Sequence, residues 1–169
     1  IGSWGWQTVP QRHMRGMQIR YTQAKVIGGG SSINAQLYTR GNALDYDEWR
    51  QRVCTGWSYK DVLPYFRKSE DNDTYDNRYH GKGGPLGVSK PAAPLPICEA
   101  YFKAAGEAGI PRNQDMAGEK QDGVGYYQLT QRNVRRSSAS IAFLNPVRSR
   151  PNLTIRTGAQ VLRLVVENG

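Results

Sequence analysis

The residues of this sequence best suited to chemistry are a run of glycines and small polar residues from Gly28 to Asn34. Consecutive glycines let a backbone approach a ligand closely, and their N–H groups can point at an anion. The hydroxyls of Ser31 and Ser32 add further hydrogen-bond donors. Such a run suits a phosphate group or the edge of a flavin, although a flexible surface loop has the same composition.

The glycine run differs from two common nucleotide-binding motifs. No Lys-Ser or Lys-Thr follows the glycines, which excludes a P-loop. The glycine spacing is also not that of the dinucleotide-binding fingerprint. From its residues alone, the run predicts a loop that approaches a ligand, without indicating which ligand.

Histidine and cysteine, the other residue types that often carry catalysis or bind metals, are sparse. The only histidines are His13 and His80; neither has a metal-ligating neighbour close in sequence, and we expect both to be surface or turn residues. Cys54 and Cys98 are isolated, which indicates free thiols in a reducing, cytoplasmic compartment. The alternative that the two form a single disulfide stays open. No metal site is therefore predicted.

Acidic, hydroxyl and aromatic side chains are expected to have structural roles. Asp45, Asp47 and Glu48 fit the first turns of a helix better than a catalytic carboxylate pair. Ser31 and Ser32 have no nearby base that would make either a nucleophile. The tryptophans are expected to pack rather than to form stacking platforms, and they are Trp4, Trp6, Trp49 and Trp57.

Composition and charge describe a globular, basic chain. Its 169 residues are 38% hydrophobic and carry a formal net charge of +9 at pH 7. This length suffices for one domain with a core, but is short for a flavoenzyme with separate cofactor and substrate domains. The basic residues are scattered without interleaved aromatics, so no nucleic-acid partner is expected. No apolar run is long enough for a transmembrane segment.

Helical patterns occupy the middle of the chain. Ser58 followed by Asp61 has the pattern of a capping box, and Pro64 inside the same stretch is expected to kink or shorten that helix. Gly109 and Pro111 are expected to end the next one. The predicted helices are residues 43–53, 59–68, 97–108 and 137–144.

Strand-like alternation characterises residues 153–157 and 161–167. They are followed by Asn168-Gly169, the strongest two-residue hairpin signal. Because this turn has no second strand after it, and because the first residue is Ile1, we expect an internal piece of a longer protein. Residues 72–94, dense in Gly, Pro, Asn and Asp, predict a long loop that lies on the surface or bridges two subdomains.

The order of these motifs resembles that of the glucose–methanol–choline family of FAD-dependent alcohol oxidoreductases. Within that family, the sequence is most similar in character to the bacterial choline and aliphatic-alcohol dehydrogenase-like members. The similarity covers nearly the whole chain. The residues that carry it are Ala24 to Gly41, Asp45-Tyr46-Asp47-Glu48-Trp49, Gly56-Trp57-Ser58-Tyr59, Leu63 to Glu70, His80-Gly81, Gly84-Pro85-Leu86 and Arg150-Pro151-Asn152-Leu153-Thr154.

The resemblance implies FAD as cofactor and assigns contacts with it. In members with covalently attached flavin, a His occupies the position of Ile33; isoleucine has no nucleophilic nitrogen, so non-covalent FAD is expected. Val134 departs from the family pattern, because relatives often have Gly there. The implied cofactor-binding residues are Val26, Gly29, Gly30, Asn34, Ala35, Leu37 and Val161.

The resemblance also implies a fold class and a division of the chain. We expect a mixed α+β fold, part of the FAD and substrate domains, that lacks the Rossmann βαβ unit. Residues 1–41 are expected to form a flavin-contacting loop region and residues 42–150 a helical and loop part of the substrate domain. Residues 151–169 are expected to form strands with a truncated hairpin.

The implied activity is hydride transfer from the CH–OH group of choline or another alcohol to the flavin. The family's catalytic His matches neither His13 nor His80, so no catalytic residue is expected in this chain. On its own, the chain is expected to be inactive and to bind little FAD. Its partners would be an alcohol substrate and the remaining segments of the enzyme. The alternative is a non-catalytic module whose glycine loop holds an anion or polyanion.

Overall fold

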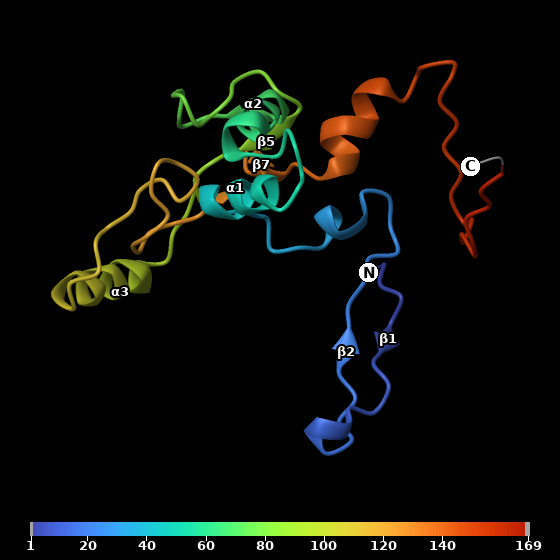
Figure 1. The fold of residues 1–169 in the computed structure, drawn as a ribbon, viewed down its shortest axis with the longest axis horizontal. Helices are drawn as coiled ribbons and strands as arrows, with labels where there is room; N and C mark the ends of the chain where they lie inside the picture. Colours follow the sequence, from blue (N-terminus) through green and yellow to red (C-terminus); the bar gives the residue numbers. More distant parts are fainter. Residues whose placement is uncertain (1, 168–169) are drawn as a thin grey trace.

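The structure, a computed structural model, describes residues 2–167. It is a mixed α+β arrangement of helices and short strands, as Figure 1 shows. The helices are α1 (Ala43–Gln51), α2 (Tyr59–Ser69), α3 (Pro96–Glu107), the 3-10 turns η1 (Arg12–Met14), η2 (Gly29–Ser32) and η4 (Asn145–Val147), and the π-helical turn η3 (Ser140–Leu144). The strands are β1 (Trp6–Gln7), β2 (Arg20–Tyr21), β3 (Leu37–Tyr38), β4 (Glu70–Asn72), β5 (Leu86–Val88), β6 (Gln128–Leu129), β7 (Gln131–Arg132) and β8 (Arg135–Arg136).

The three α-helices of the described residues confirm the helical patterns of the sequence. At α1, Asn42 Oδ1 accepts a hydrogen bond from the Leu44 N–H at 2.9 Å and so satisfies one free donor of the first turn. At α2, the Ser58 N–H and hydroxyl both donate to the carboxylate of Asp61, as the capping pattern predicted. Pro64 lies inside α2 without ending it.

The end of the fourth predicted helix differs from a regular α-helix. Residues 140–144 form a π-helical turn that continues into the 3-10 turn η4. Pro146 lies in η4, where the missing proline N–H removes one intrahelical hydrogen bond. The predicted helix therefore exists, but it begins later than residue 137 and has irregular turns.

All sheets among residues 2–167 are two-stranded. Antiparallel pairs join β1 to β2, β3 to β6 and β7 to β8, and β4 runs parallel to β5. The parallel strands are connected by the loop of residues 73–85 rather than by a helix. Pairing of β3 with β6 brings the chain after the glycine run against a segment about ninety residues later, with Leu37 opposite Leu129.

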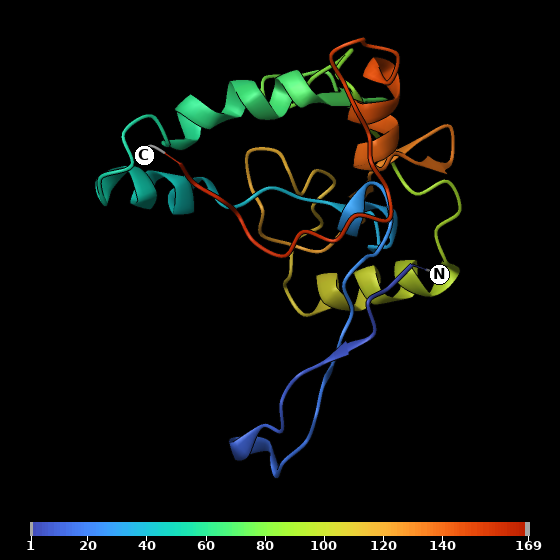
Figure 2. The same cartoon turned by 90° about the vertical axis from the view of Figure 1, so that its right-hand side faces the viewer.

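The N-terminal strands form an arm that the sequence did not predict. β1 and β2 pair in antiparallel register, and both Figure 1 and Figure 2 show this hairpin projecting away from the helices. Trp4 and Trp6 stack at a ring-centroid distance of 5.6 Å, and Lys25 lies over the Trp4 ring. The two tryptophans therefore pack on neighbouring side chains, as expected, while Trp6 stays half-exposed.

The prediction that residues 72–94 lie on the surface was wrong near both ends of the stretch and at His80-Gly81, whereas residues 73–79 are exposed or partly exposed. Asn72, His80, Val88 and Ser89 are buried, and β5 lies within the stretch. In this stretch, glycine and polar residues do not indicate an exposed loop. The glycines let the backbone pack closely, and the polar side chains form hydrogen bonds inside the protein. A Cβ on Gly81, for example, would overlap the backbone of α2.

The predicted strands 153–157 and 161–167 do not form. Among the described residues, 154–167 have no hydrogen-bonding partner, and a strand requires one. Val161 is 77% exposed in this segment. The predicted turn at Asn168-Gly169 lies outside the described residues.

Fully buried apolar side chains are few, contrary to the expected domain core. Within residues 2–167, the buried apolar residues are Val88, Ala105, Ala117 and Ala142. The largest completely buried side chains are instead polar, apart from Val88, and they cluster around His80 and Glu70. The centre of this region is therefore held by hydrogen bonds and charge more than by apolar packing.

Candidate cofactor-binding loop and its supporting network

The glycine run forms a tight turn whose geometry requires glycine at its start. Gly28 and Gly29 have φ angles of 91° and 56°, a region that residues with a side chain rarely adopt. A Cβ on Gly28 would lie 2.4 Å from Ser32 Oγ. The turn that follows, η2, therefore begins where only glycine fits.

The next two glycines face open space. A Cβ placed on Gly29 or Gly30 would have no heavy atom within 4 Å apart from its chain neighbours. Packing inside this chain thus does not require glycine at either position. At Gly29, the positive φ angle alone favours glycine. An open backbone of this kind leaves room for a ligand to approach closely, so the loop fits a group such as the flavin or its phosphates.

The structure brings most of the predicted cofactor residues together. Gly29, Gly30, Asn34 and Ala35 belong to one continuous turn, and Asn34 and Ala35 are exposed. Val26 precedes the turn and is half-exposed; Leu37 opens β3 directly after it. Val161 lies in the extended C-terminal segment, where no hydrogen bond among the described residues ties it to the loop.

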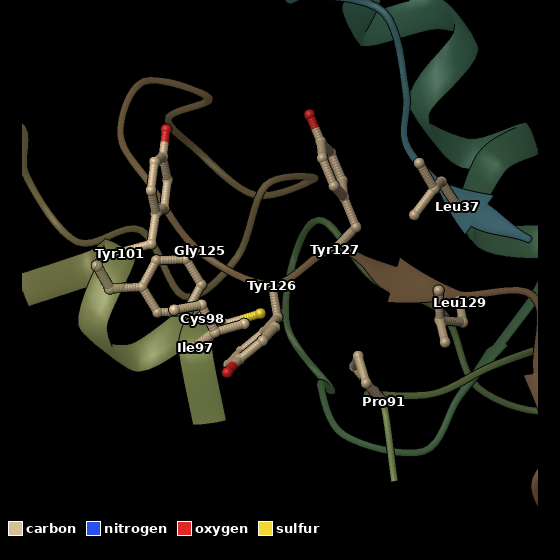
Figure 3. A pocket seen from close by; sticks show the side chains of 10 residues that line it. Leu37, Pro91, Ile97, Cys98, Tyr101, Gly125, Tyr126, Tyr127 and Leu129 are labelled. Atoms are coloured by element: carbon tan, nitrogen blue, oxygen red, sulfur yellow. The ribbon is translucent and has the colours of Figure 1, made fainter. Parts of the chain in front are cut away.

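Leu37 also borders an apolar groove of about 370 Å³, shown in Figure 3. One wall is α3 with Ile97, Cys98 and Tyr101, and the other is formed by the paired strands β3 and β6. Tyr126 and Tyr127 approach from the chain before β6 (Figure 3). The groove thus begins where the candidate cofactor loop ends.

Behind the loop lies a buried polar network centred on His80. The ring is completely buried, with Nδ1 2.9 Å from Glu70 Oε1 and Nε2 3.0 Å from both carboxylate oxygens of Asp115. Asn72 Nδ2 also lies 3.0 Å from Nδ1, but its two hydrogens are taken up by hydrogen bonds to Glu70 Oε1 and Gln128 Oε1. Both ring nitrogens therefore donate to carboxylates, and the ring is an imidazolium. The prediction of a surface or turn histidine was therefore wrong about exposure for His80. A turn does end there, because the His80 backbone N–H donates to the Asn77 carbonyl at 3.2 Å.

Glu70 connects this histidine to the strand that follows the glycine loop. Its second oxygen accepts hydrogen bonds from Arg40 Nη2 at 2.6 Å and from the Gly81 N–H at 3.0 Å. Arg40 in turn lies two residues beyond β3, and Nη1 donates to the Tyr79 carbonyl at 2.5 Å. The network therefore fixes the chain just beyond the candidate cofactor loop.

Amide side chains complete the network. Asn72 and Gln128 exchange two hydrogen bonds, of 2.8 Å and 3.0 Å, and Asn72 Nδ2 also donates to Glu70 Oε1 at 2.7 Å. Gln128 is in β6, the partner of β3. The end of β4 and the strand that flanks the candidate loop are thus linked through neutral as well as charged groups.

The electrostatics of the network favour its charged form. Burial alone would lower the pKa of His80, but the hydrogen bonds and charges of Asp115 and Glu70 raise it to about 9. Burial alone would raise the pKa of Glu70, but hydrogen bonds from His80 and Asn72, the charge of Arg40 and the Gly81 N–H lower it. At neutral pH the histidine is positive and the glutamate negative.

Sequence reasoning missed this network because each of its members is unremarkable alone. Glu70 was noted only as the last residue of a run that carries the family resemblance, and Asn72 and His80 were taken as parts of a loop. The usable signal was the large number of hydrogen-bonding groups in a segment rich in glycine, which can pack inward when the partners are present. Arg136, which contacts the glycine loop from β8, was likewise counted among scattered basic residues.

Other classes of site are not found in the described residues. No three His, Cys, Asp or Glu side chains of residues 2–167 are grouped to hold a metal ion. Cys54 and Cys98 are free thiols, which decides the question of a disulfide that the sequence left open. Within the same residues, no helix has the length and apolar character to cross a membrane.

A family model described as GMC oxidoreductase matches residues 11–169 of the sequence. The chain belongs to the GMC oxidoreductase family. This is the family of FAD-dependent oxidoreductases that the motif order indicated.

Sequence relatives of this GMC chain include choline dehydrogenases. It is 40% identical over 155 residues to the oxygen-dependent choline dehydrogenase of Brucella anthropi, covering 92% of this chain and 28% of that protein. It is 39% identical over 165 residues to the mitochondrial choline dehydrogenase of Mus musculus, covering 98% and 28%. The chain therefore spans under a third of the length of these curated relatives.

Solved structures agree with the fold. Pyridoxine 4-oxidase from Mesorbium loti superposes with a TM-score of 0.88 at 34% identity, covering 99% of this chain and 33% of that one. An FAD-dependent oxidoreductase from Chaetomium thermophilum superposes with a TM-score of 0.82 at 35% identity, covering 90% and 28%. The mixed α+β arrangement is thus that of a region of a GMC oxidoreductase.

Proposed function

We propose that this chain is the flavin-contacting region of an FAD-dependent dehydrogenase or oxidase that acts on the CH–OH group of choline or a related alcohol. The observation that carries the proposal is the open turn at Gly29 and Gly30, where the backbone is uncovered. The similarity to choline dehydrogenases supports the choice of alcohol. When bound, FAD would supply the acceptor for the hydride of the alcohol carbon.

The residues that would hold the cofactor form one short region. Gly29, Gly30, Asn34 and Ala35 would contact the flavin, with Val26 before the turn and Leu37 after it. We assign Val161 to the adenine end, on the sequence resemblance alone. Ile33 offers no nitrogen for a covalent bond, so the FAD would be held non-covalently.

No residue of this chain is proposed as the catalytic base. His80 has both ring nitrogens engaged by carboxylates and is completely buried, so it has no free nitrogen for a substrate proton. A base for the hydroxyl proton would come from the remaining segments of the enzyme. We therefore expect the chain alone to be inactive.

Exposed apolar side chains support the proposal that further polypeptide packs here. Ile97 and Tyr101 on α3 are 70% and 66% exposed, and both line the apolar groove. Large apolar patches of this kind mark surfaces that are covered in the working protein. The two free thiols, Cys54 and Cys98, support a reducing compartment, which we propose is the cytoplasm.

The alternative, a polyanion-binding module, finds less support. Three arginines close to the glycine loop or its supporting network are engaged within the chain: Arg40 binds Glu70, Arg132 binds Asp71 at 2.7 Å and Arg136 binds the glycine loop. Paired guanidinium groups contribute little to a phosphate-binding surface. The arrangement therefore favours a cofactor region over a basic docking surface.

The proposal is tested on the full-length protein that carries this segment. We expect the purified protein to show a flavin absorbance band, acid precipitation to release that flavin into the supernatant, and anaerobic addition of choline or another alcohol to bleach the band. A protein that holds no flavin would refute the proposal, whereas flavin retained in the precipitate would refute only non-covalent attachment.

A further inference from the structure

The loop proposed to contact the flavin is itself held by a distant arginine. Arg136, at the end of β8, donates from Nη1 to the Ser31 carbonyl at 3.0 Å and to Asn34 Oδ1 at 2.7 Å. Its Nη2 donates to the Asn34 carbonyl at 2.8 Å. One guanidinium group therefore donates hydrogen bonds to two residues of the turn, Ser31 and Asn34, which lie about a hundred residues earlier in the sequence.

A second set of contacts from the same segment reaches the loop. The Ala139 N–H donates to Ser31 Oγ at 2.9 Å, and that hydroxyl donates to the Gly28 carbonyl at 2.5 Å. The segment is anchored in turn, since Ser137 Oγ accepts a hydrogen bond from the buried Gly87 N–H at 3.1 Å. The loop is thus clamped against a fixed part of the fold.

The contact with Arg136 determines which end of the Asn34 side-chain amide forms hydrogen bonds within the chain. Asn34 Oδ1 accepts from Arg136 Nη1 and also from the Gln36 N–H at 3.1 Å. The side-chain hydrogen bonds of Asn34 within residues 2–167 both involve Oδ1, and Nδ2 makes none with these residues. A cation beside Oδ1 excludes the flipped amide, because that would place two donors against each other. The amide N–H group remains available to a ligand.

We infer that Arg136 is a positioning residue for the cofactor: it holds the Gly28–Asn34 turn in shape and orients the Asn34 amide so that its N–H group serves the flavin. The inference rests on the proposed function, since it requires that this turn contacts FAD. Arg136 itself contacts the loop and not the reacting atoms. It therefore acts through Asn34.

The geometry requires arginine and not merely a positive charge. A planar guanidinium can address Asn34 Oδ1, the Asn34 carbonyl and the Ser31 carbonyl together, whereas a lysine ammonium is a compact point charge on a flexible stem. Arg136→Lys should therefore keep the charge and lose the simultaneous contacts. Since a hydrogen bond from a charged donor is worth a factor of roughly ten or more, we expect FAD binding to weaken about tenfold.

The experiment compares three variants of the full-length protein. Arg136→Lys removes the clamp; Arg135→Lys is the matched control, because Arg135 makes no side-chain hydrogen bond or ion pair among the described residues. Asn34→Asp keeps the acceptor for Arg136 but removes the amide donor. For each we would measure the FAD dissociation constant, the visible circular dichroism of the bound flavin and hydrogen exchange of residues 28–36 in the FAD-free protein.

The inference makes a distinct expectation for each variant. Arg136→Lys should speed exchange at the Asn34 and Gln36 amides, change the flavin dichroism and weaken FAD binding, while Arg135→Lys should match the unmodified protein. Asn34→Asp should keep slow exchange yet change the flavin dichroism. Far-ultraviolet circular dichroism equal to the unmodified protein establishes that each variant is folded.

Failure of the inference and failure of the proposed function have different signatures. If the unmodified protein binds FAD and Arg136→Lys matches it in affinity, dichroism and exchange, the inference alone is overturned. An Asn34→Asp variant that leaves the flavin dichroism unchanged overturns the role given to the amide. If the unmodified protein binds no FAD, the proposed function fails, and the inference falls with it.

Discussion

At His80, two carboxylates hold one imidazolium ring that has no contact with solvent. A charged histidine in such a position is stable only because Glu70 and Asp115 offset the cost of removing it from water. The glutamate is itself shared with Arg40, so two cations and two anions lie within one hydrogen-bonded group. The alternation of charge explains how so polar a centre can be buried.

The raised pKa of His80 makes stability depend on pH in a defined direction. Its pKa is about 9 in the folded protein and 6.5 in the unfolded chain, so the folded state binds the proton more tightly. The stabilisation is complete below about pH 6.5 and is lost as the pH rises through about 9. It amounts to about 3 kcal/mol, from the free energy that accompanies such a difference in pKa.

We therefore expect the free energy of unfolding in urea to fall between about pH 6.5 and pH 9.5, and this fall to disappear in His80→Gln. His13→Gln, at an exposed histidine, is the matched control and should keep the pH dependence of the unmodified protein. Equal pH profiles for His80→Gln and the unmodified protein would show that another group is responsible.

Among the elements, the β7–β8 hairpin matters most for the candidate site, because it carries Arg136. Its two turn residues, Asn133 and Val134, both have positive φ angles, 51° and 62°. This is the geometry of a tight two-residue hairpin turn, for which Asn-Gly is the preferred sequence. Valine at the second position is strained, since its branched side chain disfavours the left-handed region.

Replacement of Val134 by glycine, which adopts positive φ angles without a steric cost, should relieve this strain. Val134 is 71% exposed, so the substitution loses little apolar burial. We expect Val134→Gly to raise the free energy of unfolding by about 1 kcal/mol, after the entropy cost of glycine is taken into account. Val134→Thr, which keeps the branched side chain, is the control and should give no gain; a destabilised Val134→Gly would contradict the strain argument.

The elements predicted correctly are those determined by local sequence. The α1 to α3 helices follow from periodicity and from end signals such as Ser58 and Gly109, which act within a few residues. The tight turn at Asn133-Val134 was missed, because valine conceals the signal that glycine would give. The strand 161–167 was predicted and does not form, because a strand depends on a partner that local sequence cannot supply.

In the candidate site, too, the parts determined by local sequence could be predicted and the long-range contacts could not. The glycine turn could be recognised from residues adjacent in sequence, and the structure shows why Gly28 cannot carry a side chain. The contacts that support it join residues far apart, such as Arg136 with Asn34 and Gln128 with Asn72. Long-range hydrogen bonds of this kind leave no periodic trace in a sequence.

At the scale of the whole molecule, far more large apolar side chains are exposed than buried among residues 2–167. Its exposed apolar residues include Leu162 and Leu164 in the C-terminal segment and Ile97 on α3. The described residues also contain no βαβ unit, the element that holds a dinucleotide at the N-terminus of a helix. Under the proposed function, the glycine turn would supply one side of the cofactor site.

We accordingly expect the isolated 169-residue chain to retain no FAD after incubation with an excess and desalting, whereas the full-length protein retains it. The absorbance of the two desalted samples in the visible flavin band checks this. A yellow isolated chain would show that the turn and its neighbours are sufficient for binding, and that the division of the cofactor site proposed above is wrong.

The central claim is that the turn from Gly28 to Asn34 contacts the flavin. Hydrogen exchange of residues 28–37 in the full-length protein, with and without bound FAD, tests it most directly. We predict slower exchange in this segment when FAD is bound, because the cofactor covers the open backbone at Gly29 and Gly30. Unchanged exchange there, in a protein shown by its absorbance to hold FAD, would contradict the claim.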